Sequence, residues 1–189
     1  MSKKEQIIIS TARLFQQQGI NAVGIKEILA ASHVPKGSLY YYFPDGKRQI
    51  IKAAIKAMGD DMCTNIEKQL SSSPDFETSF HHLITGMIDS LDETAHAGTW
   101  SLSLMVMETA QDETLNALCQ QIVLNMSYLY AQKLKTIPLP DETANLLGLL
   151  FQSNLEGALV TCAALHDTKP LKMTEKQLIK IVKGVIDEA

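Results

Sequence analysis

Apolar residues recur at steps of three and four along nearly the whole chain, the pattern of helices that each bury one face. Glycine, proline and serine interrupt this pattern at Gly19, at residues 71–74 and at residues 137–140. Aromatic residues, which favour strands, make up 6% of the chain. These features predict an all-α fold of about nine helices, at residues 3–18, 25–31, 36–43, 47–70, 75–93, 99–109, 112–135, 141–165 and 174–187.

Three cysteines, Cys63, Cys119 and Cys162, stand at wide spacings with no CxxC pair. An odd number at these spacings argues against a disulfide framework and a zinc site, so we expect reduced thiols, no metal and no cofactor. No apolar run approaches the roughly 18 residues that cross a bilayer, and the N-terminus lacks a signal-peptide core. We therefore expect a cytoplasmic protein with no membrane contact.

Charge is divided unevenly along the chain. Residues 1–56 carry nine basic and three acidic side chains, while the remainder carries eight basic and eighteen acidic ones. A basic N-terminal segment followed by an acidic body suggests that the segment binds a polyanion such as nucleic acid. A chance cluster of solvated lysines is the alternative.

The second and third predicted helices are short and joined by a tight turn. Pro35 suits the first position of a helix, so it opens the third helix directly after this turn. Three short helices with such a turn have the geometry that places one helix in the major groove of DNA. Leu39 and Phe43, four residues apart on the third helix, are expected to point inward. They would meet Phe15 and Ile28 in the core.

The other side of the third helix carries groups that suit DNA. Three consecutive tyrosines, Tyr40 to Tyr42, cannot all be buried on so short a helix, and their hydroxyls can bond phosphate oxygens. Lys36 lies at the helix start, where it can reach guanine, and Gly37 would let the backbone approach the groove closely. Packing against the next helix is the alternative role for the tyrosines, most of all for Tyr40.

Two runs, IKEIL at residues 25–29 and VPKGSLYYYF at residues 34–43, followed by Lys47, resemble the DNA-binding signature of TetR-family repressors. The resemblance is dense over residues 5–56. It implies a regulator whose third helix reads operator DNA. The residues expected to contact DNA are Lys26, Lys36, Gly37, Ser38, Tyr40, Tyr41, Tyr42 and Lys47.

By the same resemblance, residues 1–46 would form the helix-turn-helix DNA-binding domain. Residues 47–189 would form a helical effector-binding and dimerisation domain, linked to the first by a long helix at residues 47–70. Two positions depart from the family pattern. Gly24 stands where Ser or Thr is common, and three residues, 44–46, separate Phe43 from the following lysine where most members have two.

The longer turn resembles the branch that contains the lincomycin-resistance repressor and flavonoid-responsive repressors, which implies an aromatic or drug-like small-molecule effector. It also leaves two neighbouring cations, Lys47 and Arg48, as rival phosphate contacts at the start of the long helix. We prefer Lys47.

The segment at residues 146–160 is apolar nearly all the way round, and the last predicted helix is amphipathic. Two such helices from each of two chains would form a four-helix interface, as in the homodimers of the TetR family. Packing of both helices within their own chain is the alternative. The residues expected at the interface are Phe151, Leu155, Leu159, Ile181 and Val185.

An effector pocket is expected in the acidic body, where methionines pack adaptably around ligands and a single tryptophan could stack on an aromatic ring. Polar groups on apolar helices would anchor the ligand, with Gln152 as a further anchor. Each of these residues could instead be plain core. The pocket candidates are Trp100, Met105, Glu108, Met126, Phe151 and Asn154.

The sequence therefore predicts a ligand-responsive repressor that binds a palindromic double-stranded operator as a homodimer and is released by its effector. The chain carries none of the nucleophile, metal-protease or phosphate-loop motifs that would favour an enzyme. The remaining alternative is a helical small-molecule-binding or adaptor protein that does not bind DNA.

Overall fold

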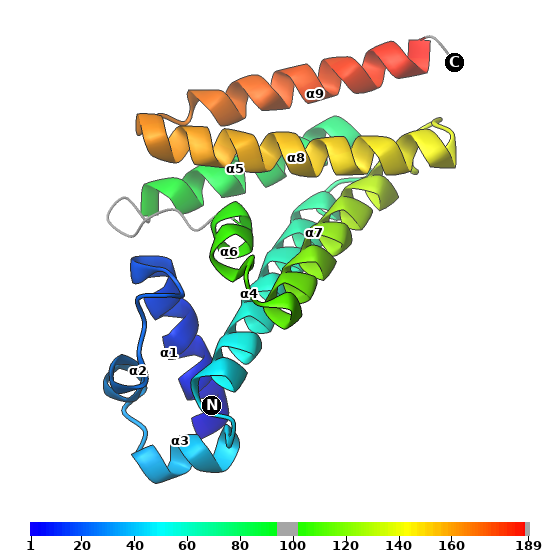
Figure 1. Ribbon diagram of the computed structural model, residues 1–189. Helices are drawn as coiled ribbons and strands as arrows, with labels where there is room; N and C mark the ends of the chain where they lie inside the picture. The colour runs from blue at the N-terminus through cyan, green and yellow to red at the C-terminus, as the bar shows by residue number, and fades with distance from the viewer. Residues whose placement is uncertain (94–101, 188–189) are drawn as a thin grey trace. The chain divides into compact units, whose positions relative to one another are not determined.

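The computed structural model describes residues 1–93 and 102–187. Within them every residue of regular structure is helical, which confirms the all-α prediction. The last helix begins earlier than predicted, because a helix accepts Pro170 in its first turn. The helices are α1 (Lys3–Gln18), α2 (Ile25–Ser32), α3 (Lys36–Tyr42), α4 (Lys47–Leu70), α5 (Phe76–Glu93), α6 (Leu102–Thr109), α7 (Glu113–Leu134), α8 (Asp141–Leu165) and α9 (Lys169–Asp187) (Figure 1).

The chain packs into two compact units. Unit 1 contains Met1–Asp61 and Leu102–Gln121, and unit 2 contains Met62–Ser101 and Ile122–Ala189. Helices α4 and α7 each contribute residues to both units. The two units are defined by packing and not by function. The predicted boundary between a DNA-binding domain (residues 1–46) and an effector-binding domain (residues 47–189) therefore stays a prediction.

In unit 1, α1 packs against α2 and α3. The four side chains predicted to share this core are at most 1% exposed: Phe15, Ile28, Leu39 and Phe43. Thr11, also buried in α1, donates its hydroxyl proton to the carbonyl of Ile7 at 2.7 Å, so its polar atom is satisfied. The core therefore fixes which side of α3 faces outward.

Helix α2 begins at Gly24, which has no hydroxyl to cap the first turn. The carboxylate of Glu27 instead reaches back and accepts the backbone N–H of Gly24. This contact is half of a capping box, and it places a negative charge at the positive end of the helix. The departure from the family pattern at Gly24 is thus partly compensated within the helix.

In unit 2, α9 packs along α8 and against α5 (Figure 1). Phe151 of α8 lies at the centre of an aromatic core, with its ring centroid 5.0 Å from Phe80, 6.0 Å from Phe76 and 6.2 Å from Tyr130. Helices α7 and α8 approach closely at Gly148, because a Cβ there would come within 2.9 Å of the Ala131 Cβ.

Helix α8 contains an 18-residue window with a mean hydropathy of 1.3, of which 39% is buried. By length and composition it is the one described helix that would suit a membrane span. The central helix of a water-soluble protein has the same properties, so this finding is weak support for a membrane role.

Candidate functional site

Helix α3 presents an exposed polar and aromatic face. A three-residue turn with His33 in the left-handed conformation (φ 52°) separates it from α2, and Pro35 precedes its first residue as predicted. Lys36 is exposed and Tyr41 is 80% exposed. Tyr42 is half-buried, and its ring meets that of Tyr41 edge to face at 5.0 Å. The structure thus leaves aromatic groups on the side of α3 that the core does not use.

Gly37 lies on the same helix in open surroundings. A Cβ at this position would have no neighbour within 4 Å among the described residues. The backbone there is helical, so any residue would fit the chain itself. The internal packing of the chain gives no reason for a glycine at this position.

Tyr40 has a share in packing. It is 42% exposed, and its ring lies 3.7 Å from where a Cβ of Gly46 would be. Gly46 has a positive φ of 66°, a conformation that favours glycine, and its N–H donates to the carbonyl of Phe43 at 2.9 Å. Tyr40 therefore covers the turn that leads from α3 into α4.

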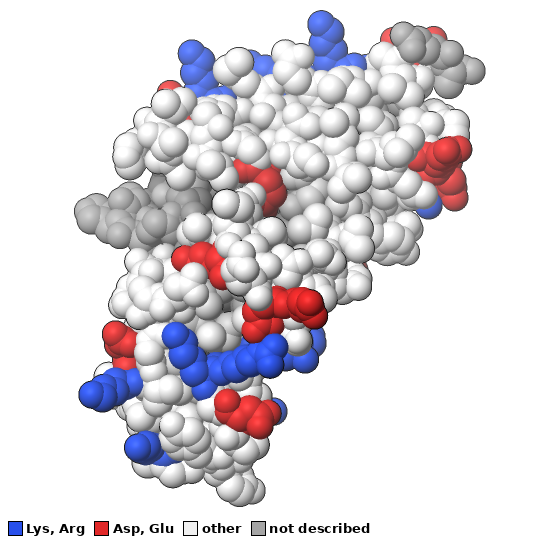
Figure 2. Space-filling model, viewed as in Figure 1, with Lys and Arg blue, Asp and Glu red and all other residues white. Residues whose placement is uncertain are grey.

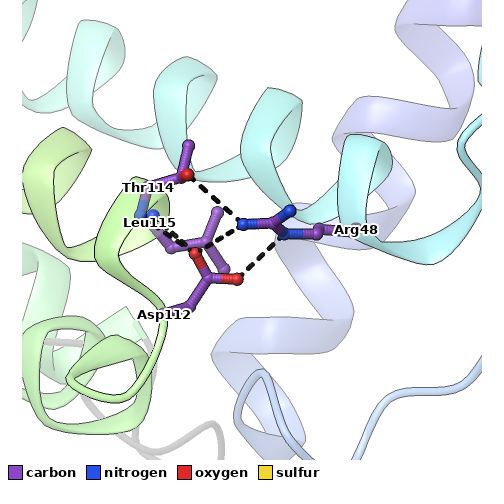
Figure 3. Close-up of polar contacts among 4 residues, drawn as sticks. All are labelled: Arg48, Asp112, Thr114 and Leu115. Carbon is purple, nitrogen blue, oxygen red and sulfur yellow. Dashed lines mark hydrogen bonds and ion pairs between the residues drawn. The ribbon is translucent and has the colours of Figure 1, made fainter.

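Lys47 and Arg48 differ sharply in their surroundings. Arg48 donates from Nε to Asp112 at 2.9 Å, from Nη2 to the other oxygen of Asp112 at 3.0 Å, and from Nη2 to Thr114 at 3.2 Å (Figure 3). The guanidinium holds the pKa of the Asp112 carboxyl below its ordinary value. Lys47 is half-buried and has no salt bridge in the described part of the chain.

Basic side chains gather around the N-terminal helices on the face seen in Figure 2, and others lie along α9. Lys26 on α2 is exposed, like Lys36 on α3. Ser38 is half-buried at the first turn of α3. The predicted DNA-contacting side chains thus reach the surface of unit 1 to different degrees, with Lys26, Lys36 and Tyr41 the most open.

A second contact ties α6 to the N-terminal helices within unit 1. Helix α1 ends at Gly19, whose φ of 80° and ψ of 163° suit glycine alone. The next residue, Ile20, donates its backbone N–H to Oε2 of Glu108 at 2.5 Å. Glu108, predicted as a polar anchor for an effector, is therefore engaged by the backbone after α1.

The other predicted pocket residues lie in different settings. Trp100 is outside the described residues. Met105 is buried in unit 1, and Met126 and Phe151 are buried in unit 2. Asn154 is exposed and donates its side-chain amide to the carbonyl of Leu150 at 2.8 Å, so it lies on the outer surface of α8.

Two large polar side chains in unit 2 are buried, and only one of them was considered for the pocket from the sequence. Tyr130 of α7 is 1% exposed and Gln152 of α8 is 3% exposed. The Tyr130 hydroxyl and the Gln152 Oε1 have no hydrogen-bond partner among the described residues. Gln152 was weighed from the sequence as a further anchor. Tyr130 gave no signal, because one tyrosine in an apolar helix is most often plain core.

The predicted interface residues on α8 require a correction. Phe151 and Leu155 are each 1% exposed in their own chain, so they cannot also contact a partner. The prediction failed because α8 is apolar all round, and periodicity alone did not show which face turns inward. Leu159 and Val185 are half-buried and Ile181 is 40% exposed. The apolar residues that α8 leaves exposed are Leu146, Leu149, Leu150, Val160 and Leu165.

Comparison with known families matches most of the chain in two parts. Residues 7–54 match the family described as "Bacterial regulatory proteins, tetR family". Residues 77–177 match the family described as "Transcriptional regulator LmrA/YxaF-like, C-terminal domain". The first match contains α2 and α3, and the second contains Phe80, Tyr130 and Phe151 of the aromatic core of unit 2.

Individual proteins agree with these matches. The chain is 30% identical over 181 residues to the uncharacterized HTH-type transcriptional regulator YxaF of Bacillus subtilis, covering 95% of each chain. It is 25% identical over 169 residues to the HTH-type transcriptional regulator LmrA of the same species, covering 89% of this chain and 90% of LmrA. A TetR transcriptional regulator from Legionella pneumophila has a similar fold, with a TM-score of 0.80, 17% identity and coverage of 96% and 97%.

Proposed function

Because this chain belongs to the TetR family of bacterial transcriptional regulators, we propose that it is a repressor that binds a palindromic operator as a homodimer and releases it when a small molecule binds. Membership of the family makes the chain a DNA-binding regulator and not an enzyme. In the proposal, residues 1–46 bind DNA and residues 47–189 bind the effector and the second subunit. The protein would act in the cytoplasm.

The exposed face of α3 is the observation that carries the DNA-binding role. Tyr41 is 80% exposed although tyrosine is a large, partly apolar side chain, and the same helix anchors its other face with the fully buried Leu39. A tyrosine in this position can donate its hydroxyl to a phosphate and place its ring against a thymine methyl. Lys36, which is also exposed on α3, supplies a donor for guanine.

Gly37 supports the same role for α3. A glycine lowers helix stability relative to alanine, and the chain offers no internal reason for one at this position. Close approach of the α3 backbone to the wall of a DNA groove would require a residue without a side chain. The open surroundings of Gly37 therefore support close approach of DNA at this residue.

We assign the phosphate contact at the start of α4 to Lys47. Arg48 is held by Asp112 and Thr114, so its use by DNA would first require these contacts to break. Lys47 has no competing salt bridge in the described residues and lies in the first turn of α4, where backbone N–H groups also favour an anion.

The dimer would form through the exposed faces of α8 and α9. Leucine and valine side chains on α8 remain open to solvent, and Ile181 on α9 is 40% exposed. A Cβ at Gly157 of α8 or at Gly184 of α9 would have no neighbour within 4 Å in residues 1–93 and 102–187, so another helix could approach closely at both places. A two-fold axis would pair the same faces of two chains into a four-helix interface.

The effector would bind in the body and favour a state of the dimer in which the two α3 helices no longer match successive major grooves, about 34–36 Å apart. Coupling between effector binding and DNA binding requires only that the effector bind one state of the dimer more tightly than the other. The coupling free energy is typically about 1–3 kcal/mol. The branch resemblance favours an aromatic or drug-like molecule as the effector.

The test is fluorescence anisotropy with the DNA upstream of the protein's own gene and with a random duplex, each at about 50 and 200 mM salt. The wild type should prefer the upstream DNA, and Tyr41→Ala should lose most of this preference. Lys176→Ala, which removes an exposed lysine from α9, serves as the charge control and should bind like the wild type. Failure of the wild type to bind any duplex at low salt would instead support the adaptor alternative.

A further inference from the structure

We propose that Tyr130 and Gln152 form the polar end of an effector site inside unit 2, and that they select an uncharged aromatic ligand with a hydroxyl group. This inference rests on the proposed effector response of the regulator. It assigns the response to two residues on facing helices, α7 and α8, neither of which has an exposed side chain.

Both residues carry a buried polar atom that forms no hydrogen bond with any described residue. The Tyr130 hydroxyl and the Gln152 Oε1 have almost no contact with solvent and no hydrogen-bond partner among the described residues. Buried polar atoms in folded proteins are nearly always paired, because burial without a partner is costly. Two such atoms in one unit are consistent with a group from outside the chain that supplies their partners, which is the proposal made here.

Tyr130 and Gln152 lie in the same part of unit 2. Gln152 Nε2 donates to Oε1 of Glu156, one turn along α8, at 3.5 Å. The ring centroid of Tyr130 lies 6.2 Å from that of Phe151, the residue directly before Gln152. Burial, and after it the negative charge of Glu156, raises the pKa of Tyr130 far above its usual range, which agrees with this placement.

The chemistry of the two buried polar atoms limits what they can bind. The Tyr130 hydroxyl stays protonated and can donate, whereas the Gln152 Oε1 can only accept. A ligand hydroxyl accepts one hydrogen bond and donates another, so a single hydroxyl can satisfy both residues. The negative charge of Glu156 disfavours a carboxylate at the same place.

Aromatic side chains lie next to Tyr130 and could contact the rest of the ligand. The ring of Tyr130 packs against Phe151, which itself contacts Phe80 and Phe76. Aromatic side chains prefer edge-to-face or offset contacts with other rings, and these four offer such surfaces beside the polar atoms. An aromatic ring that carries the hydroxyl would lie among them, after rearrangement of side chains that now fill the core.

Isothermal titration calorimetry of the full chain with 2-naphthol, 2-methoxynaphthalene and 2-naphthoate tests this site. The hydroxyl compound can pair with both residues, the methoxy compound can only accept, and the carboxylate is charged. We expect 2-naphthol to bind at least about 10-fold more tightly than the other two. Equal affinity for the three compounds, or no binding of 2-naphthol, would overturn the proposal.

Tyr130→Phe removes the unpaired hydroxyl and little else. We expect it to weaken 2-naphthol binding at least about 10-fold while the thermal midpoint of the free protein stays equal or rises, because a buried unpaired group is lost. Tyr128→Phe is the matched control on the same helix, since Tyr128 is 60% exposed, and it should bind 2-naphthol like the wild type. A buried water between the two residues would give the opposite result, a lower midpoint with unchanged binding.

The calorimetry needs no DNA, so it separates this inference from the proposed function. If 2-naphthol binds as expected but the protein ignores every duplex, the site stands and the repressor assignment falls. If the protein binds its upstream DNA but Tyr130→Phe leaves 2-naphthol affinity unchanged, the repressor assignment stands and this site is wrong.

Discussion

Arg48, in the first turn of α4, and Asp112, just before α7, form a two-pronged ion pair within unit 1 (Figure 3). The same Asp112 carboxylate accepts the backbone N–H groups of Thr114 and Leu115 at 3.0 and 3.1 Å. One side chain thus caps the start of α7 and fixes an arginine that lies 64 positions earlier in the chain.

Substitutions at Asp112 should separate these two tasks. Asp112→Asn keeps an oxygen that can cap α7 but loses the ion pair, whereas Asp112→Ala loses both. We expect Asp112→Ala to lower the thermal midpoint by about 2–4 °C and Asp112→Asn to lower it by less. Circular dichroism melts of the two variants check this. Equal losses would show that the cap contributes nothing.

The ion pair should be insensitive to pH over the neutral range. Arg48 lowers the pKa of Asp112 in the folded chain, so the stabilisation is complete above the ordinary value of 3.8 and disappears as the pH falls through the lowered one. The difference in thermal midpoint between the wild type and Asp112→Asn should be constant from about pH 8 to pH 5 and shrink only below about pH 4. A difference that already changes between pH 8 and pH 6 would contradict this assignment.

Lys36 and Lys47 should affect DNA binding in different ways. Lys36→Ala is expected to weaken binding to the upstream DNA about 10-fold and to a random duplex much less, because a base contact is lost. Lys47→Ala is expected to weaken both and to reduce the slope of log affinity against log salt by about one, because a phosphate contact is lost. Equal losses on both duplexes for Lys36→Ala would remove its base-reading role.

Gly37→Ala should raise or preserve the stability of the folded protein and weaken its binding to DNA. The new methyl group meets nothing within 4 Å in the described chain, and alanine stabilises a helix interior by about 0.5–1 kcal/mol relative to glycine. Urea unfolding should therefore show equal or higher stability, while anisotropy shows about 10-fold weaker binding to the upstream DNA. A variant with full affinity would mean that α3 does not approach the groove at this residue.

The exposed face of α8 should be sensitive to charge if it forms the dimer. The double variant Leu149→Glu and Val160→Glu would bury two carboxylates in the interface, so we expect its dimer dissociation constant to rise at least about 100-fold in sedimentation experiments. Met107→Glu is the matched control, since Met107 of α6 is 76% exposed in unit 1. A monomeric wild type, or equal behaviour of the two variants, would refute this interface.

The sequence predicted the elements that local signals determine. Pro35 and the tyrosine run located α3, and the inward direction of Leu39 and Phe43 followed from their spacing. For α8 the same reasoning failed, because an apolar residue on every side leaves no polar face to mark the exterior, and Phe151 and Leu155 were assigned to the wrong surface.

Contacts between distant parts of the chain also lay beyond sequence reasoning. The approach of Glu108 to Ile20 joins residues 88 positions apart, and no local pattern records it. The isolation of the Tyr130 hydroxyl depends on the side chains that pack around it from other parts of the chain. Such features follow from tertiary packing, which a periodicity analysis does not include.

The junction between Gly19 and Glu108 limits which amino acids the first loop can accept. The backbone at Gly19, with φ 80° and ψ 163°, already admits glycine alone, because the left-handed conformation that asparagine tolerates has a ψ of about 30–60°. Any Cβ at this position would also come within 2.5 Å of Oε1 of Glu108. A change at Glu108 would therefore not free Gly19 for substitution, and a larger residue at position 19 would both strain the backbone and displace the carboxylate that accepts the Ile20 N–H.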